Sequence, residues 1–390
     1  MELGRFTGFI LDDPLQGILD TDVLDGDVDF DAIPQGVVSV STSRGRNRDL
    51  ERTNAGQLSV SLRNQDRFFD PRGGSVFADF VVPRNPVRVQ ADGTAVFTGL
   101  IDDWAFTYSP GGESVASFSA SDAFALFARN VNDGGAAPEE LTGARLNRVL
   151  DQVRVNWPAL QRDIDSGNST LAAGSVDDNT LNYLTSVVEG SEQGLVFMSK
   201  DGRVAFRERL TTPTLSPVEF RDDGLGVPYE DVQISYGTDL MVNQAIVTFP
   251  GGTAIREDLT SQVRYGITER TLDTELSSLG QAQGIADYLI SRYAEPEYRV
   301  ESVTVNLRTL TDAQVGDVLD LELGDQARLV FTPNAVGSAI SVANRVIGIS
   351  HDVGFFEHRV TFNLEVLPFL FFILDDGTFG ILDGEGILGF

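Results

Sequence analysis

The chain has 390 residues, no cysteine and a formal net charge of −29, from 29 basic and 58 acidic side chains. The lack of cysteine excludes disulfides, thiolate metal sites and cysteine nucleophiles, and the negative charge argues against a protein that reads DNA sequence, because it repels phosphate. Apolar residues make up 42% of the chain, enough for real hydrophobic cores, and the length favours about two to four domains.

Residues 1–30 form an apolar and acidic N-terminal segment. They lack the basic start and apolar stretch of a secretory signal, and no apolar run in the chain approaches the roughly 20 residues that span a bilayer. We therefore expect a soluble chain that is neither exported by the usual route nor inserted in a membrane.

Four aspartates alternate in and just after this segment: Asp25, Asp27, Asp29 and Asp31. A calcium-binding EF-hand loop that began at Asp25 would need Gly at its sixth position and Glu at its twelfth, where the chain has Phe30 and Gly36. A solvated acidic face is the better interpretation, and a Ca²⁺ site is the alternative.

Residues 31–130 are predicted to form a first β-barrel domain. Apolar and polar residues alternate along four short segments, which is typical of strands with one buried face. The segments are Leu58–Asn64, Val87–Val89, Val96–Ile101 and Val115–Ala120. Gly99, inside the third segment, predicts a bend or bulge at a barrel corner, and Ser121-Asp122 predicts the start of a short helix.

Residues 131–228 are predicted to form an α+β middle domain that begins with a Gly/Ala/Pro-rich linker at 133–138. Apolar residues at helical spacing predict a helix over Leu141–Val153, and Asp177-Asp178 is expected to cap a second helix. Two alternating segments around the turn Lys200-Asp201-Gly202 predict a β-hairpin.

Residues 229–367 are predicted to form a second β-barrel domain with a helical insert near 279–294, where apolar residues share one face before Pro296. The strands repeat the order of the first domain, with Gly348 in the third. They are Val303–Thr309, Val318–Leu321, Arg345–Ser350 and Val360–Glu365. The predicted fold class is therefore mainly β with α+β inserts, as two β-barrels joined by α+β domains.

The two ends of the chain repeat each other. Residues 9–20 align without a gap with residues 372–383, and nine of the twelve positions are identical. Each copy has an apolar triplet closed by two acids, Phe9-Ile10-Leu11-Asp12-Asp13 and Phe372-Ile373-Leu374-Asp375-Asp376, the second within a C-terminal segment at 368–390. Since apolar triplets are costly in water, we predict that both dock as short strands or turns, either on the edges of this chain's own barrels or on a neighbouring protein by strand addition. The alternative is that they are simply the outermost strands of the fold.

One basic cluster stands out in this acidic chain: Arg44, Arg46, Arg48 and Arg52. Because arginine can grip a carboxylate with two hydrogen bonds, the cluster is predicted to contact an acidic partner, including the Asp-rich segments of neighbouring copies. The alternative is a solvated turn that neutralises local acid.

The sequence predicts neither catalysis nor a cofactor. The only histidines, His351 and His358, flank an expected turn at Gly354 and are interpreted as surface residues, too few for a metal cluster. Asp102 and Asp103 are adjacent in a strand and so point to opposite faces. The sequence contains no nucleophile elbow and no phosphate-binding loop, so we expect a non-enzymatic protein.

Several stretches, taken in order, carry a family resemblance. They are Val40–Asn64, Asp66–Pro71, Pro86–Val89, Phe97–Trp104, Glu192–Phe197, Asp201–Arg209, Asn243–Ala245, Tyr265-Gly266 and Ala286–Pro296. This series resembles the minor tail or tail-hub proteins of long non-contractile-tailed phages of actinobacteria, and the resemblance covers most of residues 8–367.

The resemblance implies a baseplate-hub fold, with two barrel domains of the tail-tube type joined by α+β inserts. A trimer of such chains would place six barrels in a ring and join a sixfold tail tube to a threefold tip in the virion. The implied partners are further copies of the chain, the distal tail protein, the tape-measure protein and other tail-tip proteins. Viral DNA would pass through the ring without specific binding.

Three other functions serve as alternatives. A hexameric distal tail protein ring needs only one barrel per chain, whereas two are predicted here. A host-wall carbohydrate-binding β-module usually exposes aromatic platforms, but the chain has only two tryptophans, Trp104 and Trp157. A tail-associated peptidoglycan hydrolase would need a catalytic constellation that the sequence lacks.

Overall fold

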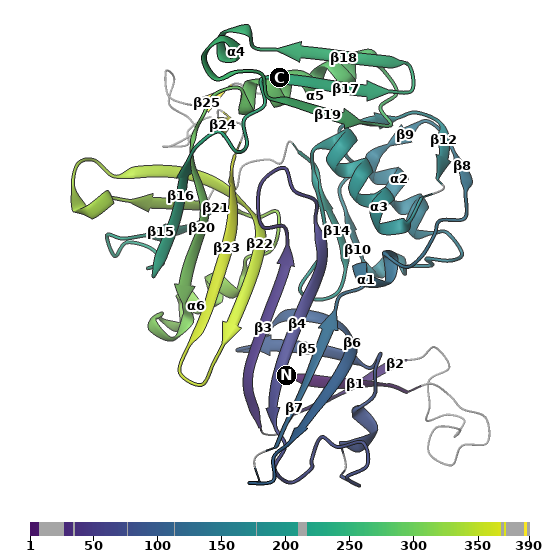
Figure 1. Ribbon diagram of the computed structural model, residues 1–390, viewed down its shortest axis with the longest axis vertical. Coiled ribbons are helices and arrows are strands. Elements are labelled where there is room, and N and C mark those ends of the chain that lie inside the picture. The colour runs from purple at the N-terminus through teal and green to yellow at the C-terminus, as the bar shows by residue number, and fades with distance from the viewer. Residues whose placement is uncertain are drawn as a thin grey trace.

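The computed structural model describes residues 1–7, 27–33, 36–75, 77–112, 114–176, 178–209, 217–367, 370–371 and 386–387. Two sets of strands dominate the fold (Figure 1). The first set is β1 (Glu2–Thr7), β2 (Asp27–Ala32), β3 (Val37–Gly45), β4 (Asn54–Arg63), β5 (Pro86–Ala91), β6 (Thr94–Tyr108) and β7 (Ser114–Ser121). The second set is β15 (Val218–Arg221), β16 (Asp231–Tyr236), β20 (Tyr298–Asn306), β21 (Gln326–Phe331), β22 (Ile340–Val353) and β23 (His358–Val366).

All thirteen of these strands belong to one sheet. Its main path runs β16-β20-β23-β22-β3-β4-β7-β6-β5-β1-β2, while β21 pairs with β22, and β15 with β21. Both sets contain the same four-strand order, β4-β7-β6-β5 in the first and β20-β23-β22-β21 in the second. In each, the first strand pairs with the last, the last with the third, and the third with the second. The topology of the sheet is therefore duplicated within the chain.

The described strands form a continuous sheet, and no closed barrel is found among them. The sheet is continuous because β22 of the second set pairs with β3 of the first. Figure 1 shows β5 and β1 lying across the direction of β3 and β4, so the first half of the sheet curls over its own core. The prediction of a mainly β fold is confirmed, whereas the division into two separate barrels stays a prediction.

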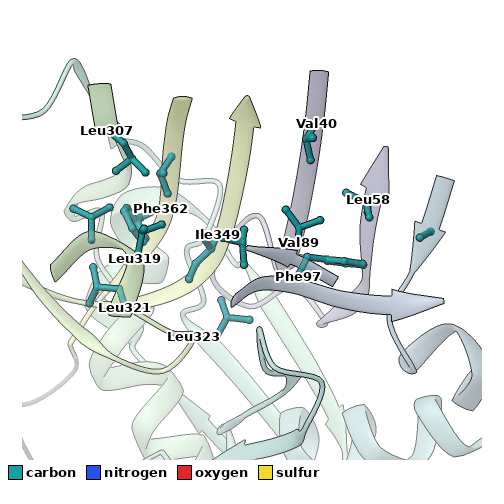
Figure 2. Close-up of a cluster of buried hydrophobic side chains, with 14 of the residues drawn as sticks. Val40, Leu58, Val89, Phe97, Leu307, Leu319, Leu321, Leu323, Ile349 and Phe362 are labelled. Atoms are coloured by element: carbon teal, nitrogen blue, oxygen red, sulfur yellow. The ribbon is translucent and has the colours of Figure 1, made fainter. Parts of the chain in front are cut away.

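The strands form where apolar residues alternate with polar ones. In β4, Leu58, Val60 and Leu62 are buried, and the residues between them are not. These side chains belong to a core that extends through both strand sets. Figure 2 shows part of it as one layer that runs from Leu58, past Ile349, to Phe362. The two sets therefore share a hydrophobic core and not only a sheet.

The middle of the chain packs as a smaller α+β unit around a core of its own. Its elements are α1 (Phe124–Phe127), β8 (Gly135–Ala137), β9 (Glu140–Leu141), α2 (Thr142–Leu150), η2 (Ala159–Gln161), β10 (Arg162–Ile164), β11 (Thr170–Leu171), β12 (Gly174–Val176), α3 (Thr180–Ser186), the π-helix η3 (Val187–Glu192), β13 (Leu195–Met198) and β14 (Val204–Arg207). The antiparallel pair β13–β14 confirms the predicted hairpin.

A third core lies between a long helix and a small sheet. The helix is α5 (Leu279–Tyr293), which lies within the insert predicted near 279–294 and buries Ile285 and Leu289.

The remaining elements of the described chain are η1 (Ala78–Phe80), β17 (Gln244–Phe249), β18 (Gly252–Glu257), α4 (Leu259–Tyr265), β19 (Glu269–Asp273), η4 (Leu307–Thr309), α6 (Asp312–Asp320), η5 (Pro333–Ala335), β24 (Leu370–Phe371) and β25 (Gly386–Ile387).

One predicted strand is wrong. Val318–Leu321 lies at the end of helix α6 and just beyond it, and β21 is the second strand of this set instead. The helix forms because Thr311 and Gln314 make a capping box. The Thr311 hydroxyl accepts a hydrogen bond from the Gln314 N–H, and the Gln314 side-chain oxygen accepts one from the Thr311 N–H.

Three smaller predictions also need correction. Helix α3 is capped by Asn179, whose side chain accepts the Asn182 N–H, and not by Asp178. The predicted linker at 133–138 contains β8, which pairs with β12. The last residues of the strand predicted at 303–309 form the 3-10 turn η4.

Candidate functional site

The junction between the two strand sets is a tightly constrained part of the sheet. Strands β22 and β3 are antiparallel over six residue pairs, from Gly348–Gly45 to Val353–Val40. A Cβ atom on Gly45 would lie 2.3 Å from the Ile347 carbonyl oxygen, and one on Gly348 would lie 2.3 Å from the Arg46 carbonyl oxygen. Both contacts are far shorter than a van der Waals distance. The two backbones can therefore lie this close only if both positions are glycine.

The two glycines that the sequence singled out have different surroundings. The ladder between β22 and β23 shifts between Val346 and Gly348, so the predicted bulge is present at Ile347, directly before Gly348. In β6 the shift against β7 comes between Ile101 and Asp103, after Gly99. A Cβ on Gly99 would lie 2.5 Å from the Ser121 carbonyl oxygen, so its role is a close backbone approach.

A buried ionic cluster lies beside the junction. Glu365 on β23 accepts hydrogen bonds from Arg46 Nη2 at 2.5 Å and from Arg345 Nε on β22 at 2.6 Å. Next to it, the Tyr293 hydroxyl of α5 donates to Asp49 Oδ2 at 2.7 Å. All five residues are buried, and together they connect the first strand set, the second strand set and the third core.

The electrostatics of this cluster depend on the balance between burial and pairing. Burial alone raises the pKa of Glu365, but the adjacent guanidinium groups of Arg345 and Arg46 outweigh it and bring that pKa to about 2. Burial and the charge of Glu365 raise the pKa of Asp49. The space beside the cluster is about 20 Å³, room for roughly one water molecule. The cluster therefore connects three parts of the fold and leaves no room for a substrate.

The four predicted arginines have two different roles. Arg44 and Arg46 are buried, so the prediction that the whole cluster meets an outside partner needs correction for these two. Arg44 Nη1 donates to Glu322 at 2.7 Å and to the Met198 carbonyl oxygen at 3.2 Å. The acidic partners of both lie in this chain.

The other two arginines remain at the surface. Arg48 has a half-exposed side chain 3.7 Å from Glu301, and Arg52 donates to the Asn182 side chain at 2.8 Å. Of the predicted cluster, only Arg48 and Arg52 are placed to meet another molecule.

The two histidines form a pair in a cavity between the strand sets. His351 Nδ1 lies 3.1 Å from His358 Nε2, and both side chains line a cavity of about 350 Å³ together with Val40, Thr42 and Val89. His351 is only 5% exposed, so its interpretation as a surface residue is wrong. Burial, with a further contribution from the neighbouring His358, lowers the pKa of His351 well below its usual value.

Other predicted residues contribute no site in the described parts of the chain. The duplicated terminal motifs, Phe9–Asp13 and Phe372–Asp376, lie outside the described residues, as does Asp25. Asp103 is exposed next to the bulge in β6. Among the described residues, no group of three or more His, Asp or Glu side chains is arranged to hold a metal ion. None of the helices described is both long and apolar enough for a membrane crossing.

Comparisons with known proteins add the fold relationship. No family model matches the chain, and no curated protein matches it. A tail protein from Neisseria meningitidis has 12% identity and a TM-score of 0.59, over 93% of this chain and 95% of its own. A 43 kDa prophage tail protein from Shewanella oneidensis has 12% identity and a TM-score of 0.56, over 94% and 98%. A prophage tail protein from Listeria monocytogenes has 10% identity and a TM-score of 0.52, over 93% and 94%. The chain thus shares, nearly end to end, a fold that phage tail proteins use.

Proposed function

We propose that this chain is a structural hub protein of a phage tail tip. The observation that carries the proposal is the duplicated strand order, β4-β7-β6-β5 and β20-β23-β22-β21, within one chain. A chain with two equivalent halves presents two similar surfaces in succession. Such a chain is suited to meet a sixfold tube with only three copies, because three chains contribute six halves. The likeness to solved phage tail proteins supports the same role.

In this proposal the chains form a trimeric ring in the virion that lines the exit path of the DNA. The net charge of −29 supports it, because a negative wall repels the phosphate backbone and does not trap the polymer. The ring would contact the distal tail protein, the tape-measure protein and other tail-tip proteins, and the duplicated termini would dock on one of these neighbours.

The proposed role is non-enzymatic, and the likeness to solved phage tail proteins supports it.

The native mass of the purified assembly tests the proposal. Three times the chain mass of 42.3 kDa supports the hub, whereas six times that mass would favour a distal tail protein ring. A chain that stays monomeric, and is absent from the tip of labelled virions, would refute both.

Binding to free duplex DNA is a second test. The proposal expects no detectable binding at moderate salt, because few cations are available to replace the counterions of the phosphates. Salt-sensitive binding at sub-micromolar concentration would contradict the proposed passage of DNA.

A further inference from the structure

Strands β6 and β16 each keep one side unpaired within the described residues. β6 pairs with β5 over Thr94–Leu100 on one side and with β7 over Leu100–Tyr108 on the other. On the β5 side, Ile101 still exchanges backbone hydrogen bonds with Arg84 and Asn85, so this side has no strand partner beyond Ile101. β16 pairs with β20 and stands at one end of the sheet. Each edge therefore presents a row of backbone N–H and C=O groups that another strand can pair with.

The duplication shows how the equivalent edges are used inside the chain. β22 corresponds to β6, since each pairs with the last strand of its four-strand order, β23 or β7, and each has a bulge in that ladder, at Ile347 and at Asp102. β3 corresponds to β16, since each pairs with the first strand of one four-strand order, β4 or β20. Beyond the bulge, Gly348–Val353 pairs with Val40–Gly45. The unpaired edges of β6 and β16 therefore correspond to the two strands that pair within the chain as β22 and β3.

Burial differs between the closed contact and the open edges. Ile349 on β22 and Val40 on β3 are 3% and 6% exposed where their strands meet. Trp104, which takes the place of Ile349 in β6, is only partly buried, and Tyr108 near the end of β6 is 51% exposed. Val232, which takes the place of Val40 in β16, is also only partly buried. Apolar side chains are thus covered at the β22–β3 contact but partly open at the equivalent edges of β6 and β16. This difference indicates that another strand covers those two edges.

We propose that the open edge of β6 pairs, antiparallel, with β16 of a second copy of this chain. The register follows from the contact within the chain, where Asp352 lies opposite Ser41 and Val353 opposite Val40. It puts Thr107 opposite Gln233 of the partner subunit.

In this register, the proposed pair of strands has one apolar face and one polar face. Tyr108 faces Val232 of the partner subunit, as Val353 faces Val40 within the chain. Thr107 and Gln233 of the partner subunit take the place of an exposed polar pair, in which the Ser41 hydroxyl donates to Asp352 Oδ1 at 2.8 Å.

A second copy fits these edges because they are complementary and lie on the same chain. Each copy would give one edge and receive the other, which is a head-to-tail contact that closes into a ring when its rotation permits. That the ring closes after three copies rests on the proposed function. The strand pairing itself does not depend on the number of copies in the ring.

Engineered disulfides test the register, and the chain suits them because it has no cysteine. The variant Thr107→Cys/Gln233→Cys should form disulfides between copies on oxidation, whereas either single variant should not. Both positions are exposed, so the cysteines leave the core unchanged. The control Thr107→Cys/Asp231→Cys moves one cysteine two residues along the same face. The Cα atoms are then about 7–8 Å apart, too far for a disulfide.

The outcomes separate the strand pairing from the proposed function. Cross-linking of the first pair but not the control supports the pairing, and a covalent product that ends at three chains supports the hub as well. Equal cross-linking of both pairs, or none in an assembly with the mass of three copies, overturns the pairing and leaves the hub intact. A correct cross-link in a six-copy or open-ended assembly keeps the pairing and rejects the hub. A monomer that never cross-links rejects both.

Discussion

The two strand sets have the same strand order but line their shared core differently. The first set adds a cluster of aromatic side chains to its aliphatic residues, in which Phe77 packs against Phe69 and Phe80 with ring centroids 6.0 and 5.3 Å apart. The second set contributes mainly Val, Leu and Ile, and helix α6 occupies the connection where the first set has a loop with the short turn η1. The comparison shows that the pairing order is the constrained property, while the side chains that line the core are free to differ.

The two sets also differ in how their edges are secured. The second set meets the first through paired backbones, two glycines and the buried ionic cluster. In the first set, the later part of β6 has an open edge, and no buried charge pair of this kind lies beside it among the described residues. The predictions below test whether that cluster and those glycines are what makes the inner junction permanent.

The largest effect is expected from the substitution Glu365→Gln. It leaves Arg46 and Arg345 buried without their shared carboxylate, which should lower the free energy of unfolding by about 3–5 kcal/mol. The matched control is Glu230→Gln, which removes a surface pair with Arg359 and should cost about 1 kcal/mol or less. Urea unfolding of both variants measures the difference. Equal losses would show that the cluster adds nothing to the junction.

A somewhat smaller effect is expected from Gly45→Ala. Its φ is +87°, and the new Cβ would meet the Ile347 carbonyl oxygen, so the loss should be on the order of 1–3 kcal/mol. Gly112→Ala is the control, because its φ is +91° but its Cβ would have open space. Thermal unfolding should show a clearly larger loss for Gly45→Ala. A similar loss for both would mean that φ strain, and not the close passage of strands, explains the glycine.

Much of the fold could be predicted from local patterns. Helix α5 was predictable because its apolar residues follow the helical repeat and Pro296 stops it. Val318–Leu321 differs because four alternating residues are too few to distinguish a strand from the end of a helix, and the Thr311–Gln314 capping box starts a helix upstream.

The ionic cluster could not be predicted in the same way. Arg46 and Glu365 are 319 residues apart, so no local spacing connects them. A weak signal existed, since Arg345 and Glu365 are charged residues at the ends of apolar strand segments. Which acid meets which base is decided by the sheet register, and a single sequence does not contain that information.

A pH effect should distinguish the inner junction from the open edge. Because the pKa of His351 is depressed in the folded state, the unfolded chain binds a proton more readily below the ordinary value of 6.5. Stability should therefore fall as the pH drops below about 6.5, by about 1.4 kcal/mol for each pH unit down to the folded-state pKa.

The equivalent residue in β6 suggests the variant that tests this effect. Phe106 takes the place of His351 in the first set, and His351→Phe should flatten this part of the pH–stability curve. Urea midpoints measured between pH 5 and 7.5 would show it. An unchanged acid limb in the variant would assign the effect to other groups.

The smallest effect on folding is expected at the open edges. Thr107→Lys/Gln233→Lys would place like charges opposite each other between copies, which costs up to about 1 kcal/mol per contact and weakens assembly by about five-fold. The fold itself should be unaffected, because both side chains are exposed. The variant Thr107→Glu/Gln233→Lys should restore assembly. Sedimentation measures both, and identical assembly of the two variants would argue against the proposed register.

The pairing of β3 with β22 also affects how the protein is made. Ser41 and Asp352 are 311 residues apart, so at a synthesis rate of about 5–20 residues per second β3 waits roughly 15–60 s for its partner. During that time β4 can cover only one side of it. The waiting edge is a hazard for misassembly on the ribosome. Ser39, Ser41 and Ser43 are exposed on the outer face of β3, so this face of the strand is polar while it waits for β22.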